Sequence, residues 1–181
     1  MMRVIAGEFK GRRLASPREA NLRATTDKVR EALFNILAFK IEGASFLDIY
    51  AGSGAVGIEA MSRGARPVVF VENDKNNILL LKKNLALLPD HPEAHVVYGD
   101  AIDYLKKNKI CFDIIFMDPP YEGGDLETLL QTLGCCDTMP PQSVVIFEHF
   151  HKKILPDAAG DFSVLRRYRY GGTTLSLYVK K

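Results

Sequence analysis

Between residues 45 and 149 the chain alternates short apolar runs with helix-like stretches, and this alternation restricts its fold more than any other feature. Five apolar runs rich in Val, Ile and Phe predict buried strands at residues 45–50, 67–72, 95–99, 112–117 and 143–149. The stretches between them predict helices at residues 55–63, 74–88, 101–107 and 126–133. Such an order predicts an α/β fold, with a parallel sheet covered by helices on both faces.

The two ends of the chain depart from this alternation. Residues 162–170 and 173–179 alternate in polarity on either side of Gly171 and Gly172, which predicts an antiparallel hairpin after the parallel strands. Residues 26–39 predict an amphipathic helix before the first strand, with Val29, Leu33 and Ile36 on one face. A plain dinucleotide-binding domain does not need that terminal hairpin.

Length and composition bound the class of protein. The 181 residues fit one domain with a full core. No apolar run approaches the ~20 residues that cross a bilayer, and the N-terminus lacks the apolar centre of a signal peptide, so we expect a cytoplasmic protein without a membrane partner. The three cysteines form no C-x-x-C pair, and His149 and His151 lack an evident third ligand, so we expect no metal site.

Positive charge is concentrated near the N-terminus. Residues 1–30 contain eight basic and three acidic residues, a net +5 in a chain whose total is +2. Either this segment is a solvated basic tail, or it is an arm that contacts a polyanion. We predict that residues 1–24 form a small β-hairpin extension that contacts RNA, before a catalytic domain at residues 25–181. The predicted RNA-contacting residues are Arg3, Lys10, Arg12, Arg13, Arg18 and Arg23.

A glycine-rich loop follows the first predicted strand. Gly52, Gly54 and Gly57 match the spacing of a dinucleotide-binding loop, and Glu72 follows twenty residues after Gly52. Asp48 opposes a pyrophosphate at this helix N-terminus but favours the ammonium and sulfonium of S-adenosylmethionine. The predicted cofactor-contacting residues at these strand ends are Asp48, Ala51, Gly52, Ser53, Gly54, Glu72, Asn73, Asp100 and Ala101.

Glu72 can accept ribose hydroxyls from either class of cofactor, so it does not discriminate between them. Asp100 can reach an adenine amino group, although it is equally well placed to cap the helix that starts at Ala101.

The fourth predicted strand ends in Asp118, Pro119, Pro120 and Tyr121. Open α/β sheets bind ligands at the carboxyl ends of their strands. The Asp118 carboxylate and the Pro119 carbonyl can accept both N–H groups of a planar exocyclic amine, and Tyr121 offers a ring on which a base can stack. We therefore predict that these four residues hold a base amino group for methyl transfer.

Given these motifs, the sequence resembles the bacterial 16S rRNA guanine-N2-methyltransferases over nearly its whole length. The matching segments are residues 3–7, 23–37, 48–60, 62–65, 118–121 and 170–174. The resemblance implies a seven-stranded class I methyltransferase sheet, Rossmann-like, with strand order 3-2-1-4-5-7-6 and the last strand antiparallel. It implies S-adenosylmethionine as cofactor, with Thr26 beside its amino-acid end. It also implies a guanine in the 16S rRNA of the small ribosomal subunit, or of an assembly intermediate, as substrate.

Three other functions stay open at this point. The Asp118–Tyr121 turn also suits a DNA adenine-N6 methyltransferase, although the chain has no room for an added target-recognition region. A nicotinamide-dependent oxidoreductase would use the glycine loop but leave that turn unexplained. A non-catalytic RNA-binding protein could share the fold.

Overall fold

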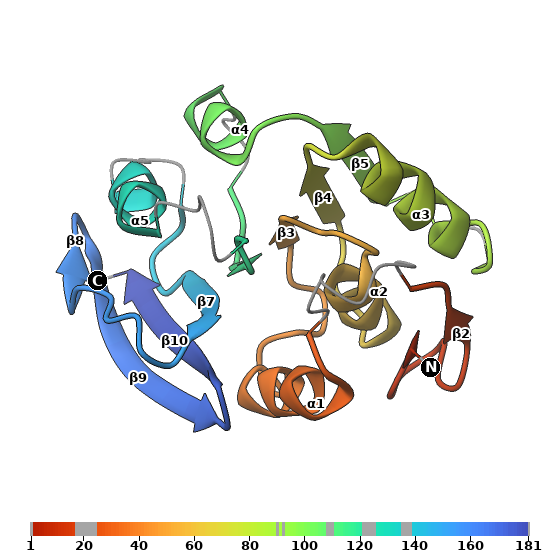
Figure 1. The fold of residues 1–181 in the computed structure, drawn as a ribbon, viewed down its shortest axis with the longest axis horizontal. Coiled ribbons are helices and arrows are strands. Elements are labelled where there is room, and N and C mark those ends of the chain that lie inside the picture. The colour runs from red at the N-terminus through yellow and green to blue at the C-terminus, as the bar shows by residue number, and fades with distance from the viewer. Residues whose placement is uncertain are drawn as a thin grey trace.

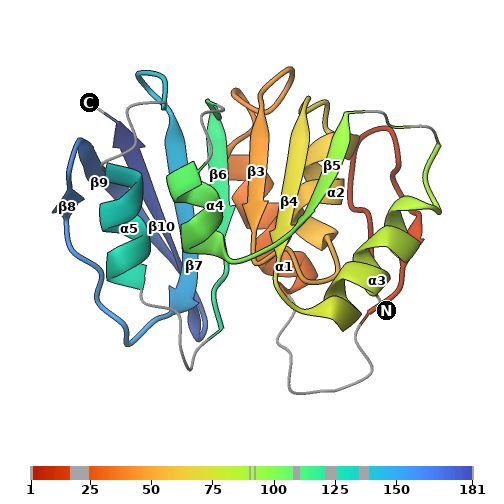
Figure 2. The same ribbon diagram turned by 90° about the horizontal axis from the view of Figure 1, so that it is seen from above.

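In the computed structural model, the described residues are 2–16, 25–89, 91, 93–107, 111–120, 126–134 and 139–180. Tyr121, Arg18 and Arg23, named above as site residues, lie outside these ranges. Figures 1 and 2 show a central sheet with helices on both faces.

The sheet has the order β5-β4-β3-β6-β7-β10-β9-β8. Its parallel part consists of β5 (Ala94–Tyr98), β4 (Val68–Glu72), β3 (Phe46–Ile49), β6 (Ile114–Met117) and β7 (Val144–Phe150). The antiparallel part comprises β10 (Thr173–Lys180), which pairs with β7, and β9 (Phe162–Tyr170), which pairs with β10. The predicted order 3-2-1-4-5-7-6, with its last strand antiparallel, is confirmed.

A short strand extends this sheet beyond the prediction. β8 (Ala158–Ala159) pairs with Phe162 and Ser163 at the start of β9, across a turn in which Gly160 has φ +55°. Two alanines carry no periodic signal of their own, because their strand conformation depends on this turn.

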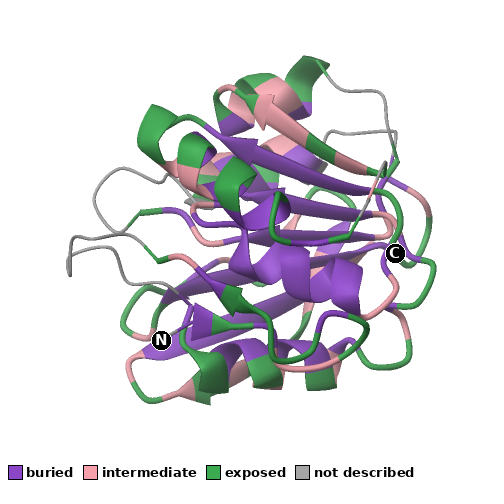
Figure 3. Ribbon diagram, turned by 90° about the vertical axis from the view of Figure 1, so that its right-hand side faces the viewer, coloured by how far each residue is buried: buried purple, intermediate pink, exposed green. Residues whose placement is uncertain are grey.

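The helices divide between the two faces of the sheet (Figure 1). The first face carries α1 (Asp27–Ile36), α2 (Ala55–Ser62) and α3 (Lys75–Leu85), and the second carries α4 (Ala101–Lys107) and α5 (Leu126–Gly134). Helix α1 ends three residues before the predicted end, because Leu37 is its C-cap. In Figure 3 the buried residues occupy the middle of the molecule, between the exposed faces of the helices.

The N-terminal segment packs on the domain instead of extending into solvent. β1 (Met2–Arg3) and β2 (Arg13–Leu14) pair antiparallel, and Met2, Val4, Phe9 and Leu14 are buried in the same core as α1 and α2. Residues 2–16, which we call the N-terminal hairpin, therefore add to the hydrophobic core and cover α2, all of whose residues are buried.

One carboxylate fixes this hairpin to the domain. Glu59 of α2, with 0% of its surface exposed, accepts hydrogen bonds from the backbone N–H groups of Ile5 and Ala6 at 2.7 and 3.0 Å. The Nε of Arg63 donates to it at 2.8 Å, and the Nε of the buried Arg30 lies 3.8 Å away. Burial lowers the pKa of Arg30, and the carboxylates of Asp27 and Glu59 oppose that effect.

Candidate functional site

The carboxyl ends of β3, β4 and β5 bring three polar side chains into one neighbourhood. Tyr50 follows β3, Glu72 ends β4, and Asp100 lies two residues after β5. Burial raises the pKa of the Tyr50 hydroxyl, and the charges of Asp100 and Glu72 raise it further. The three groups therefore lie close enough to interact, at the sheet edge where open α/β folds bind ligands.

Tyr50 is the member of this group that sequence reasoning did not assign to the site. Its φ of +63° is unusual for a residue with a bulky side chain, and such strain is concentrated at binding and catalytic sites. The signal in the sequence was its position directly between a buried strand and the glycine loop.

The glycine loop makes a tight turn from β3 into α2. The N–H of Gly54 donates to the carbonyl of Ala51 at 2.7 Å, and Gly52 and Gly54 have φ values of +55° and +78°. A Cβ on Gly52 would meet only the Tyr50 carbonyl, at 3.9 Å, so the loop leaves open space above this residue. A Cβ on Gly57 would lie 2.2 Å from the Phe70 ring, so this glycine allows the close packing of α2 on β4.

Asp48 lies beneath this loop. It is 1% exposed, and its Oδ2 accepts the Gly57 N–H at 2.8 Å, which fixes the first turns of α2 to β3. Burial raises the pKa of Asp48 to about 7, and the charge of Glu72 adds to the effect, whereas the bond from Gly57 opposes it. Two carboxylates of low exposure thus lie near one another, an arrangement that favours a cation and disfavours a phosphate.

The raised pKa of Asp48 predicts a specific pH dependence of stability. The ordinary value of 3.8 applies to the unfolded chain and about 7 to the folded one, so the folded state binds the proton more tightly. The resulting stabilisation is complete below pH ~4 and is lost as the pH rises through ~7.

Urea unfolding of the cofactor-free protein tests this dependence. Asp48→Asn keeps an oxygen for the Gly57 N–H but does not titrate, so we expect the wild-type protein to lose stability relative to this variant as the pH rises from 4 to 8. Parallel pH profiles for the two proteins would show that Asp48 keeps an ordinary pKa.

Glu72 ties the end of β4 to the glycine loop. Its Oε2 accepts the Gly52 N–H at 2.7 Å, and its Oε1 accepts the N–H groups of Asn73 and Asp74, both at 2.9 Å. The side chain is 5% exposed. The three bonds hold the carboxylate in one orientation at the mouth of the loop.

The other predicted cofactor residues differ in what they contact. The Oδ1 of Asp100 accepts the N–H groups of Ile102 and Asp103, so this side chain caps α4. Ala51 and Ala101 are buried, and Asn73 is exposed. Ser53 is buried, and its hydroxyl lies 3.8 Å from the Sδ of Met2 in the N-terminal hairpin. Its interactions are therefore with the core.

The start of α1 faces the same sheet edge. Thr26 is the exposed N-cap of α1, and its Oγ1 accepts the Val29 N–H at 3.3 Å. The preceding Thr25 is buried and donates its hydroxyl to the Oε2 of Glu148 on β7 at 2.9 Å. Sequence reasoning missed this pair, because no local pattern connects residues 123 positions apart.

The Asp118–Pro120 segment directly follows β6. Asp118 is half-buried, Pro119 is buried and Pro120 is exposed. Met117 is aligned with Ile49 of β3 on one side and with Phe147 of β7 on the other. The segment therefore lies between the glycine loop and the Thr25–Glu148 pair.

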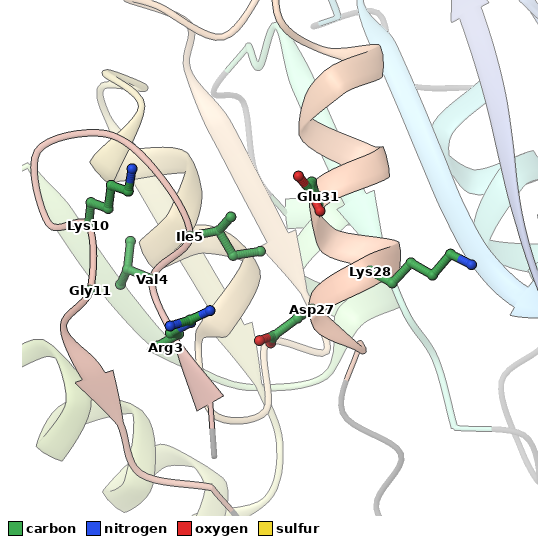
Figure 4. Close-up of a pocket in the computed structure, with 8 residues that line it drawn as sticks. All are labelled: Arg3, Val4, Ile5, Lys10, Gly11, Asp27, Lys28 and Glu31. Atoms are coloured by element: carbon green, nitrogen blue, oxygen red, sulfur yellow. The ribbon is translucent and has the colours of Figure 1, made fainter.

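The predicted RNA-contacting residues lie on the N-terminal hairpin, with Arg3, Lys10, Arg12 and Arg13 all exposed. Arg12 donates to the Leu87 carbonyl at 2.9 Å. A cavity of about 310 Å³ separates the hairpin from α1 (Figure 4). Its lining residues are Arg3, Val4, Ile5, Lys10, Gly11, Asp27, Lys28 and Glu31.

Side chains of both charges line this cavity. In Figure 4 Asp27 extends toward Arg3, whereas Lys28 points away from the hairpin. The cavity lies beside the first turns of α1 and apart from the glycine loop, so it extends the charged surface near the site and is not the cofactor pocket.

No group of three or more His, Cys, Asp or Glu side chains in the described ranges is arranged to hold a metal ion. In the same part of the chain, every helix is too short or too polar to cross a bilayer.

Comparison with known proteins agrees with this geometry. The family model described as "Conserved hypothetical protein 95" matches residues 2–179. The ribosomal RNA small subunit methyltransferase D of Escherichia coli is 36% identical over 180 residues, which cover 99% of this chain and 90% of that protein.

Solved structures of other proteins share this fold. One from Escherichia coli, described as a candidate methyltransferase, is 35% identical with a TM-score of 0.88 and covers 99% of this chain and 98% of its own. Another, a candidate methyltransferase complexed with SAH, is 15% identical with a TM-score of 0.68 and covers 84% of this chain and 48% of its own.

At 15% identity the second structure shows the fold alone, which is the predicted class I methyltransferase fold. The match over almost the whole length also confirms the resemblance drawn from the motifs. The chain belongs to the family described as conserved hypothetical protein 95.

Proposed function

We propose that this protein transfers a methyl group from S-adenosylmethionine to the exocyclic N2 of a guanine in 16S rRNA. The observation that carries the proposal is the position of Asp118, Pro119 and Pro120. They follow β6, and the strand beside it, β3, leads into a glycine loop bordered by two carboxylates of low exposure. A methyl donor at the loop and an amino group at the turn would then be neighbours.

The residues at the loop fit this cofactor. S-adenosylmethionine supplies a methyl group on a positively charged sulfur, next to an ammonium group. Glu72 is oriented by three backbone N–H groups and would accept the ribose hydroxyls. Thr26 would lie by the amino-acid end, and Asp100 by the adenine amino group. The open space above Gly52 allows a ligand to approach the backbone closely.

The turn after β6 suits a planar amine as acceptor. The lone pair of an exocyclic amino nitrogen is delocalised into its ring, so the group is a poor nucleophile. The Asp118 carboxylate and the Pro119 carbonyl would accept hydrogen bonds from its two N–H groups and orient its lone pair toward the methyl group. As the nitrogen–carbon bond forms, the bond from that carbon to the sulfur would break, and the methylated nitrogen would then release one proton. Pro119 and Pro120 restrict the backbone, so the acceptors keep their directions. Tyr121, outside the described residues, would stack on the base.

Several features support ribosomal RNA as the substrate. A relative that matches 99% of this chain is named a ribosomal RNA small subunit methyltransferase. The N-terminal hairpin presents four exposed cations, Arg3, Lys10, Arg12 and Arg13, and phosphates would bind to them. Arg18 and Arg23 would extend this contact. We further propose that the substrate is the small subunit or an assembly intermediate, which places the reaction in the cytoplasm.

The decisive experiment is transfer of radiolabelled methyl to 16S rRNA, and to small subunits, from cells that lack this protein. Nucleoside mapping should find the label in N2-methylguanosine. Label in N6-methyladenine, or only in DNA, would contradict the proposal and favour the DNA adenine methyltransferase.

Calorimetric titration separates the remaining alternatives. We expect heat with S-adenosylmethionine and none with NAD, because Asp48 and Glu72 favour a cation over a pyrophosphate. Binding of NAD alone would indicate an oxidoreductase, and binding of neither would leave an RNA-binding protein.

A further inference from the structure

β7 ends with an aromatic side chain at the same sheet edge as the site. Phe150 is the last residue of this strand, and 36% of its surface is exposed. It is aligned with Thr173 of β10, which in turn is aligned with Tyr170 of β9. Aligned residues of antiparallel neighbours point to the same face. Phe150 and Tyr170 therefore flank Thr173 on one face of the sheet.

Basic side chains lie close to the aromatic residues of β7 and β9. The Nζ of Lys152 lies 5.9 Å from the centre of the Phe150 ring, and the His151 ring meets it edge-on at 4.5 Å. On β9 the guanidinium of Arg166 lies 5.4 Å from the Tyr168 ring. Residues 150–172 contain five basic and two acidic residues, and one of the acids, Asp157, is paired with Arg167 at 2.8 Å. These residues therefore carry a net charge of +3.

Phe150 lies near the proposed target site. Phe147 is aligned with Met117, so Asp118 lies beside Glu148, and Phe150 follows two residues later. Phe150 lies three residues beyond Phe147, the residue of β7 aligned with Met117, and three residues of a strand span ~10 Å. Because side chains alternate along a strand, those at positions 146, 148 and 150 all point to the face of the sheet that α1 covers. On this face Glu148 accepts the hydrogen bond from Thr25. Phe150 is thus the next exposed side chain beyond that pair.

Ring and charge together identify the kind of partner. A protein partner with an apolar surface would need apolar residues around Phe150. The neighbours of Phe150 are instead Lys152, Lys153 and His151. Aromatic rings flanked by cations are typical of surfaces that bind single-stranded RNA, where a base stacks on the ring and its phosphate pairs with the cation.

We propose that Phe150, with Tyr170 and Lys152, forms a stacking platform for an unpaired base that neighbours the target guanine in the RNA. The inference rests on the proposed function and adds a second contact to it, on β7 and β9, apart from the N-terminal hairpin. The platform holds the RNA segment that contains the target guanine. It therefore contributes to substrate binding and not to the chemical step.

Steady-state methylation of 16S rRNA by Phe150→Leu tests the platform. Leucine keeps apolar bulk and removes the ring, so we expect KM for the RNA to rise roughly 5- to 150-fold, the range for the loss of one base–aromatic stack. The kcat value and the affinity for S-adenosylmethionine should change less than twofold. Phe150→Trp, which keeps a ring, should restore KM.

Phe39→Leu provides the matched control. Phe39 is a fully exposed phenylalanine beyond the end of α1, next to Lys40, which donates to the Gln142 carbonyl before β7. It lies at the opposite edge of the sheet, so its substitution should leave KM for the RNA unchanged.

Two results would overturn the inference while leaving the proposed function intact. One is an active wild-type enzyme whose Phe150→Leu variant has an unchanged KM for the RNA. The other is a variant that loses affinity for S-adenosylmethionine instead. By contrast, a wild-type protein that methylates neither 16S rRNA nor small subunits would refute the proposed function itself.

Discussion

Asp118→Ala is expected to lower kcat for methyl transfer to 16S rRNA by roughly 10²- to 10³-fold, the scale seen when one preorganised polar contact to a reacting group is removed. The carboxylate would hold one of the two amino N–H bonds, so without it the lone pair is no longer directed at the methyl group. Binding of S-adenosylmethionine should change little, because Asp118 follows β6 and the glycine loop follows β3. Single-turnover methylation and calorimetry measure the two quantities separately.

Asp113 supplies a control at the other end of the same strand. Its Oδ2 accepts hydrogen bonds from the backbone N–H and the hydroxyl of Ser45, at 2.9 and 2.7 Å. Asp113→Ala should therefore reduce stability while the rate of the folded enzyme stays near the wild-type value. Equal rates for Asp118→Ala and the wild type would refute the mechanism proposed for the turn after β6.

Glu59→Ala should reduce the free energy of unfolding by about 3–5 kcal/mol, the typical cost of removing one partner from a buried ion pair. The buried charge of Arg30 would then be left with the Asp27 carboxylate, at 3.0 Å. The N–H groups of Ile5 and Ala6 would lose their acceptor as well. Urea unfolding measures the change, which is a large share of the 5–15 kcal/mol by which most domains are stable.

Glu8 provides the exposed counterpart. Its carboxylate lies 3.7 Å from Arg66, and both side chains are about 60% exposed. Glu8→Ala should cost at most ~1 kcal/mol, as is usual for surface ion pairs. If the two variants were equally stable, the Glu59 cluster would not hold the N-terminal hairpin in place.

The centre of the parallel sheet could be predicted from sequence because β3, β4, β6 and β7 are almost entirely buried and contain nearly continuous apolar runs. β4 (Val68–Glu72), for example, has all five residues buried. The terminal hairpin was equally visible, since two alternating segments flank Gly171 and Gly172. Two-residue strands such as β8 give no such signal, because their conformation depends on pairing partners elsewhere in the chain.

The polar part of the site was less predictable than the strands. The sequence placed Asp48 and Glu72 at strand ends, but not their bonds to Gly57 and Gly52 in the loop. It indicated a charged N-terminal segment, yet nothing local to residues 2–16 shows that Glu59 anchors it. Such contacts depend on how α2 packs on the sheet, and side-chain chemistry alone does not determine them.

The double attachment of α1 has a mechanical consequence. The residues that lead into it are joined to β7 through Thr25 and Glu148, and its fourth residue, Arg30, is joined to α2 through Glu59. The helix therefore acts as a brace between the two halves of the sheet. It cannot tilt to admit a large substrate without breaking buried polar contacts at both attachment points. Adjustment to the shape of the RNA would then come from surface side chains and from segments outside this brace.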